Sequence, residues 1–215
     1  MSGLDPLSYV LLRKVSNIYP SKWYTSKEKE EDLMQQEAPF ESLTKLEAAE
    51  RQLRVAIRLF FQRKDLVAVH TLAAAAQGIL QDLGSHQGVK SIFKETERIQ
   101  PEYREKVTTS FRQAQNFFKH ADKNRQEKLR FYYEATKFYL FDAASLYLKL
   151  TNRPFPEALV LVGWILLKFP NLLIDEEDKK RVANAVSAGM NPDDLDSFLT
   201  VIDMLAAPPG GAPNP

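Results

Sequence analysis

The stretch SLTKLEAAERQLRVAIRLFFQR, residues 42–63, has the clearest apolar periodicity in the chain. Its apolar side chains recur every three or four residues, and Glu, Arg and Lys occupy the opposite side. This spacing is typical of one buried face on an α-helix. The apolar members are Leu43, Leu46, Ala49, Leu53, Ala56, Ile57, Phe60 and Phe61. We therefore predict a helix over residues 42–63.

A second helix is predicted directly after the first, over residues 66–83. Asp65 is placed to cap its first turn, because an aspartate side chain accepts hydrogen bonds from free amides there. The small side chains of Leu72–Ala76 should let a neighbouring helix approach closely. Gly84 is expected to end the helix.

The rest of the chain repeats the helical pattern. Further helices are predicted over residues 101–120, 125–150, 156–169, 176–188 and 193–206, the last with Asn191 as its cap and Pro192 in its first turn. No segment alternates apolar and polar residues as a strand does. The predicted fold class is all-α, an antiparallel bundle of five or more helices with short C-terminal helices. Residues 1–40 are expected to form an N-terminal arm, 41–207 a single helical domain and 208–215 a disordered tail.

Composition excludes several classes of protein. The net charge is +1, so no overall field attracts nucleic acid or an anionic membrane. There is no cysteine, which suits a reducing cytoplasm and removes thiol chemistry. The uncharged run Ala158–Leu167 is about half the length of a membrane span. The sequence has no phosphate-binding glycine loop and no paired metal-binding histidines, so we expect a cytoplasmic protein without membrane contact or cofactor.

Four polar residues near the end of the predicted helix 101–120 form the best candidate site. Arg112, Asn116 and His120 are four residues apart and share one face, with Lys119 beside them. We call these four residues the polar stripe. Arg112 and His120 lie roughly 12 Å apart along the axis, so one phosphate could contact both only if a partner chain completed the site. The alternative is that Asn116 and His120 simply end the helix.

The segment from residue 66 to residue 93 resembles a known family. Its alanine-rich helix, followed by His86-Gln87-Gly88-Val89, is similar to the second helix and His-x-Gly-Val loop of HEPN proteins, the helical "higher eukaryotes and prokaryotes nucleotide-binding" superfamily. The resemblance covers roughly residues 42–150. It implies a helical bundle, a homodimer and contact with RNA or a nucleotide.

Some HEPN proteins are metal-independent ribonucleases that use an arginine and a histidine four to six residues apart. This chain departs from that spacing, because seven residues separate Arg112 from His120, and Arg63 and His70 straddle the predicted Asp65 cap. By resemblance, Arg112 and Lys119 would hold phosphate, Asn116 would orient it and His120 would act as acid or base, in a defence or toxin system.

Two other functions stay open. The chain could be a non-enzymatic module that binds a protein partner through the apolar helix 156–169 and the C-terminal helices. Trp164, within the apolar run Ala158–Leu167, is expected to be buried and to join an interface. It could also be a bundle that binds a small ligand among the aromatic side chains of helix 125–150. His86 is a candidate ligand contact, although loop histidines are more often simply solvated. His70, among Val67 and Leu72, is interpreted as a semi-buried histidine.

Overall fold

The computed structural model describes residues 40–91, 113–120, 126, 128–172 and 176–207. The chain divides into two units, Met1–Leu43 and Thr44–Pro215, and the helices below all belong to the second. The predicted arm at 1–40 except for Phe40, the tail at 208–215 and residues 101–112 of the predicted helix 101–120 lie outside the described residues.

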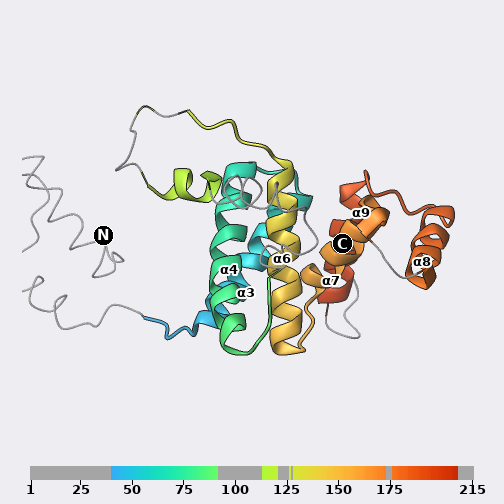
Figure 1. Ribbon diagram of the computed structural model, residues 1–215. Coiled ribbons are helices and arrows are strands. Elements are labelled where there is room, and N and C mark those ends of the chain that lie inside the picture. The colour runs from blue at the N-terminus through green and yellow to red at the C-terminus, as the bar shows by residue number, and fades with distance from the viewer. Residues whose placement is uncertain (1–39, 92–112, 121–125, 127, 173–175, 208–215) are drawn as a thin grey trace, which may run out of the picture. The chain divides into compact units, whose positions relative to one another are not determined.

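The described part of the chain is all-α and contains no strand, which confirms the predicted fold class (Figure 1). Its elements are α3 (Lys45–Phe61), α4 (Leu66–His86), α6 (Glu134–Thr151), α7 (Pro156–Lys168), the 3-10 helix η2 (Pro170–Leu172), α8 (Glu176–Ser187) and α9 (Leu195–Ala206). Residues 113–119 are also helical.

Side-chain caps fix where α3 and α4 begin. The Thr44 hydroxyl accepts a hydrogen bond from the Glu47 amide at 3.2 Å, and the Glu47 carboxylate accepts one from the Thr44 amide at 2.8 Å. Together they make a capping box. Asp65 accepts the amides of Val67 and Ala68, both at 3.0 Å, as the sequence predicted.

Gly84 does not end α4, contrary to the prediction. The helix continues to His86, and the backbone turns at Gly88, whose φ of 73° is left-handed. The Val89 amide then returns to the Gly84 carbonyl at 2.9 Å. Gly84 is needed for close packing instead, because a Cβ there would lie 2.9 Å from the Val89 carbonyl oxygen.

The predicted helix 125–150 begins later than expected. Residues 128–132 are not helical, and α6 starts at Glu134. The Phe131 ring packs at 5.1 Å from Phe118 and 5.2 Å from His70, so tertiary contacts of the side chain compete with helical propensity here. At the other end Asn152 adopts a left-handed φ of 49° and terminates α6.

The cap of α9 was also predicted wrongly. The Asn191 side chain accepts the Asp193 amide at 2.9 Å, which forms a turn before the helix. Asp194 is the actual cap, because it accepts the Ser197 amide at 3.4 Å. Pro192 therefore belongs to this turn and does not start the helix.

The first three described helical segments, α3, α4 and residues 113–119, run antiparallel to one another in turn. The α3–α4 connection is a short hairpin, and contacts of Gln115 with Ala74 and of Phe118 with His70 show that residues 113–119 run back along α4. This return makes α4 and α6 parallel, as the contact between His70 and Thr136 and that between Gln77 and Asp142 show.

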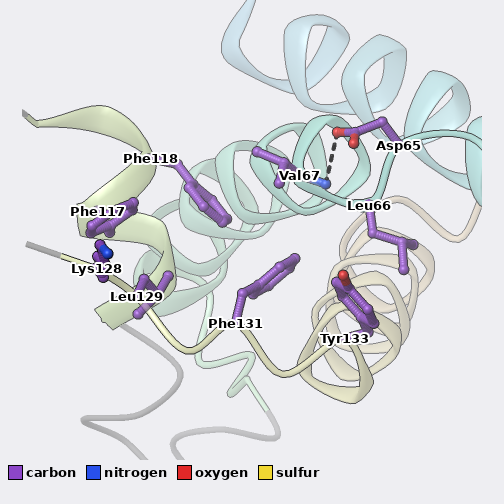
Figure 2. A pocket seen from close by; sticks show the side chains of 9 residues that line it. All are labelled: Asp65, Leu66, Val67, Phe117, Phe118, Lys128, Leu129, Phe131 and Tyr133. Carbon is purple, nitrogen blue, oxygen red and sulfur yellow. Dashed lines mark hydrogen bonds between the residues drawn. The ribbon is translucent and has the colours of Figure 1, made fainter.

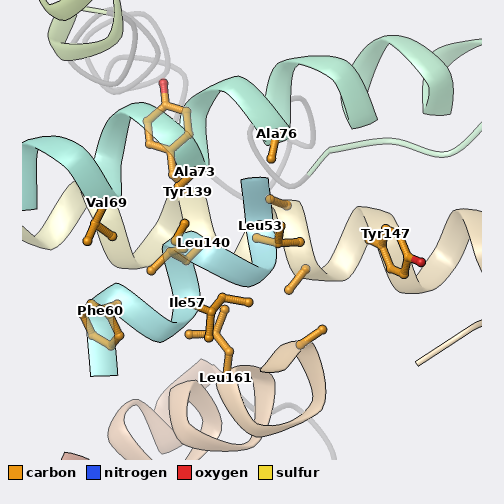
Figure 3. Packing of buried hydrophobic residues seen from close by; sticks show 14 of the residues in the cluster. Leu53, Ile57, Phe60, Val69, Ala73, Ala76, Tyr139, Leu140, Tyr147 and Leu161 are labelled. Atoms are coloured by element: carbon orange, nitrogen blue, oxygen red, sulfur yellow. The ribbon is translucent and has the colours of Figure 1, made fainter. Parts of the chain in front are cut away.

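One hydrophobic core joins α3, α4, α6, α7 and α9. Figure 3 shows its packing among side chains of α3, α4, α6 and α7. In α4, Ala73, Ala74 and Ala76 are buried, as expected of a helix with close neighbours. Trp164 of α7 is also buried, by edge contacts with Phe60 and by its indole N–H, which donates to the Pro192 carbonyl at 2.8 Å. Packing within one chain thus accounts for the burial of Trp164.

A buried carboxylate connects three of these helices. Glu157, at the start of α7, accepts hydrogen bonds from Arg54 and Arg58 of α3, both at 2.7 Å. Arg58 also pairs with Asp203 of α9 at 2.7 Å. The two guanidinium groups offset the cost of burying the Glu157 charge.

In the part of the chain that the structure describes, α4 alone is long and apolar enough to cross a membrane. It packs against α3 and α6, and two of its buried side chains, His70 and Gln77, are polar. Its apolar composition therefore also fits a helix within a bundle.

Candidate functional site

The described members of the polar stripe lie on the surface at the end of a helix. Asn116 and Lys119 are exposed on helical residues 113–119, and His120 is exposed just after the last helical residue. The His120 amide donates to the Asn116 carbonyl at 3.0 Å, so these two residues occupy one face. Arg112 lies outside the described residues.

His86 is not brought close to the polar stripe. Phe118 contacts His70 near the start of α4, at a ring distance of 5.7 Å, whereas His86 is the last residue of that helix. Sixteen residues of helix separate His70 from His86, which corresponds to roughly 24 Å. His86 and His120 therefore belong to opposite ends of α4.

An open pocket of about 720 Å³ lies next to the polar stripe (Figure 2). The start of α4, the end of helical segment 113–119 and the non-helical residues before α6 form its walls. It is lined by Asp65, Leu66, Val67, Phe117, Phe118, Lys128, Leu129, Phe131 and Tyr133. Figure 2 shows Phe117, Lys128 and Leu129 at one end, and Leu66 and Tyr133 at the other. The volume is within the range of roughly 300–1,000 Å³ found for small-molecule sites.

Four aromatic rings line the pocket and meet edge to face. Phe131 lies 5.3 Å from Tyr133 and 5.1 Å from Phe118, each at an interplanar angle of 86°. Phe117 meets Phe118 at 5.9 Å and 79°. Perpendicular rings form corners, so the wall offers both ring faces and ring edges to a ligand.

His70 lies behind this wall and is completely buried. Its ring contacts Phe118, Phe131 and Tyr139, and its Nδ1 lies 3.1 Å from the Thr136 hydroxyl. Its Nε2 has no hydrogen-bond partner among the residues that the structure describes. Desolvation by burial lowers the pKa of His70 to about 4, so the imidazole is neutral at pH 7. The histidine is more deeply buried than the sequence analysis expected.

One cationic side chain, Lys128, and one anionic side chain, Asp65, line the pocket, and they differ in whether they already have partners. The Asp65 carboxylate is engaged by the amides of Val67 and Ala68 at the start of α4. The Lys128 ammonium is exposed and forms no ion pair with any residue that the structure describes. Lys128 is therefore the pocket's cation that can pair with a ligand, while the Asp65 carboxylate is satisfied at the start of α4.

A buried polar cluster elsewhere is better explained by folding than by chemistry. Asp142 of α6 accepts hydrogen bonds from Gln77 at 2.8 Å and from Ser91 at 2.6 Å, and all three side chains are buried. The cluster ties the chain after α4 to α6. Within the described ranges no group of three or more His, Asp or Glu side chains is placed to hold a metal ion.

Sequence reasoning found the polar stripe but missed most of the pocket. Phe117 and Phe118 lie within the predicted helix 101–120, between Asn116 and Lys119, and Phe131 and Tyr133 belong to the predicted helix 125–150, whose aromatic side chains were proposed to line a ligand site. Their convergence depends on the path between helices, which no local pattern encodes. The available signal was an aromatic pair at the end of one helix and an aromatic cluster at the start of the next.

Comparisons with known proteins do not assign the site. No protein-family model, curated protein or solved structure matches the chain. The findings describe an all-helical protein with no recognised family or homologue.

Proposed function

We propose that this chain is a HEPN-like helical protein that binds RNA or a nucleotide, in the cytoplasm, on the surface formed by the polar stripe and the adjoining pocket. One observation carries the proposal. Exposed Asn116, Lys119 and His120 lie at the end of a helical segment whose Phe117 and Phe118 line an open aromatic pocket. Hydrogen-bond donors beside aromatic rings suit the phosphates and bases of nucleic acid.

The charges on this surface support binding of an anion. Lys119 and Lys128 are exposed, and neither forms an ion pair among the residues that the structure describes. The net charge of the whole chain is only +1, so the attraction has to be local. We expect moderate affinity that falls as salt rises.

A metal-independent ribonuclease is the catalytic form of this proposal. His120 would act as acid or base, because an imidazole exchanges protons readily near neutral pH, and Asn116 would orient the phosphate. Lys119 and Arg112 would bind the phosphate and stabilise its developing charge. A homodimer would bring a second copy of these residues to the same RNA, which compensates for the wide spacing of Arg112 and His120.

The test is binding and cleavage of RNA by wild type and His120→Ala in the presence of a chelator. We expect the variant to lose cleavage and to keep its helical circular-dichroism signal and melting temperature, because His120 is exposed. His86→Ala is the matched control, since it removes an exposed histidine at the other end of α4 and should change nothing. Equal RNA binding and cleavage by wild type and His120→Ala would reject the catalytic assignment.

A non-enzymatic module that binds a protein partner is the second candidate. Exposed apolar side chains favour it: Val201, Met204 and Leu205 project from α9, and Leu159 projects from α7. A second copy of the chain would cover part of this surface in the proposed homodimer. Light scattering at micromolar concentration should give twice the chain mass of 24.6 kDa, and the monomer mass would reject the dimer.

A further inference from the structure

We propose that the pocket beside the polar stripe holds one unpaired base of a bound RNA strand, with Tyr133 as the stacking surface at one end and Lys128, at the other end, as the contact for a phosphate further along the same strand. This inference rests on the proposed function and adds to it a specific place for the base. It concerns residues that the polar stripe does not include.

The shape of the aromatic wall suits a flat ring. Phe131 stands perpendicular to both Phe118 and Tyr133, so a planar group that stacks on one ring meets the edge of the next. Every nucleobase has a π-face, and single-stranded recognition commonly uses such aromatic surfaces. Leu66, Val67 and Leu129 add apolar side chains to the lining.

Charge favours RNA over an uncharged aromatic ligand. Lys128 lines the pocket, is exposed and has no ion-pair partner among the described residues, whereas the Asp65 carboxylate is held by two backbone amides. Lys119 is a further exposed cation on the segment that carries Phe117 and Phe118. A phosphate of the same strand that reached this end of the pocket would thus find a cation.

The openness of the pocket favours a strand over a free nucleotide. Tyr133 remains 60% exposed and Lys128 is exposed. Small-molecule sites usually bury most of their ligand, whereas sites for single strands expose stacking rings along a surface that the strand follows. One base could enter the pocket while the rest of the RNA strand continued past the polar stripe.

The experiment measures the affinity of a fluorescent oligoadenylate for the full chain by anisotropy. The variants are Tyr133→Ala and Lys128→Gln. Tyr132→Ala is a matched control, because Tyr132 is the adjacent tyrosine, is 64% exposed and does not line the pocket. Lys180→Gln on α8 makes the same charge change away from the pocket. Tyr133 precedes α6 and makes no side-chain cap there, but its ring contacts Phe131 at 5.3 Å, so the melting temperature of Tyr133→Ala is measured together with its affinity.

We expect Tyr133→Ala to weaken binding by roughly 5- to 150-fold, as loss of one stacked base does, and Tyr132→Ala to change it little. Lys128→Gln should make the negative slope of log affinity against log salt concentration shallower by about 0.7, because one phosphate contact is lost. Lys180→Gln should leave this slope unchanged. Duplex RNA should compete poorly, because its bases are paired and stacked within the helix. Adenosine monophosphate should also compete poorly, because it lacks the further phosphates of a strand.

The outcomes separate this inference from the proposed function. If wild type binds oligoadenylate and Tyr133→Ala binds equally well, the base site is refuted and RNA binding by the polar stripe stands. If duplex RNA competes as well as single strands, no base is stacked and the inference again fails alone. If wild type binds neither oligoadenylate nor adenosine monophosphate, both the inference and the proposed function fail.

Discussion

Acid should destabilise this protein through His70, a buried neutral histidine that must stay unprotonated in the folded state. Burial lowers its pKa to about 4, whereas an unfolded histidine has a pKa of about 6.5. Below pH 6.5 the unfolded chain therefore binds a proton that the folded chain does not. The free energy of unfolding then falls as the pH falls, and the loss ends near pH 4.

The magnitude follows from these two pKa values. Between pH 7 and pH 5 the linkage removes about 2 kcal/mol from the free energy of unfolding, and by pH 4 it removes about 3 kcal/mol. Among the residues that the structure describes, the ring contacts Phe118, Phe131 and Tyr139 and lies beside the neutral hydroxyl of Thr136. None of these contacts supplies a negative charge that would stabilise the protonated imidazole.

Urea unfolding at pH 7 and pH 5 measures this loss in wild type and in His70→Gln. The glutamine keeps a polar side chain near Thr136 but cannot take up a proton, so the variant should lose about 2 kcal/mol less than wild type over this interval. His120→Gln removes an exposed histidine and should behave as wild type. Equal losses in wild type and His70→Gln would refute the assignment of the acid sensitivity to His70.

Two further changes test packing and charge. Gly84→Ala should destabilise the fold by about 1–3 kcal/mol, because the new Cβ would lie 2.9 Å from the Val89 carbonyl oxygen. Gly78→Ala is the control in the same helix, where the new Cβ would meet no atom within 4 Å, and it should stabilise the fold by about 0.5–1 kcal/mol. Equal melting temperatures for the two variants would contradict this reasoning. Glu157→Gln should lower the free energy of unfolding by about 2 kcal/mol, because it removes the charge that pairs with two arginines. An unchanged midpoint in urea unfolding would show that these ion pairs contribute nothing.

Local signals predicted the helices well where local chemistry determines their ends. Asp65 caps α4 as expected, since a carboxylate next to free amides needs no distant partner. Two glycines near the other end were harder to distinguish. Gly88 supplies the left-handed turn, while Gly84 packs closely against Val89, and only the folded chain shows which glycine does which.

The remaining errors have a common physical cause. Residues 128–132 were predicted as helix because their composition is compatible with one, but the Phe131 ring packs on Phe118 and His70 from a non-helical backbone. Contacts between residues far apart in the sequence override weak helical propensity. The same contacts create the pocket, which is why the sequence predicted aromatic ligand contacts without predicting where they meet.

This overlap between core and pocket determines which substitutions can test function. Phe118 and Phe131 line the pocket and also contact His70, so their replacement would expose a buried imidazole and lower stability. Any loss of binding in such variants would be uninterpretable. Tyr133 and Lys128 line the same pocket without contacting His70, and both are exposed. Binding can therefore be separated from folding at these two positions and at the polar stripe, where stability and affinity should change independently.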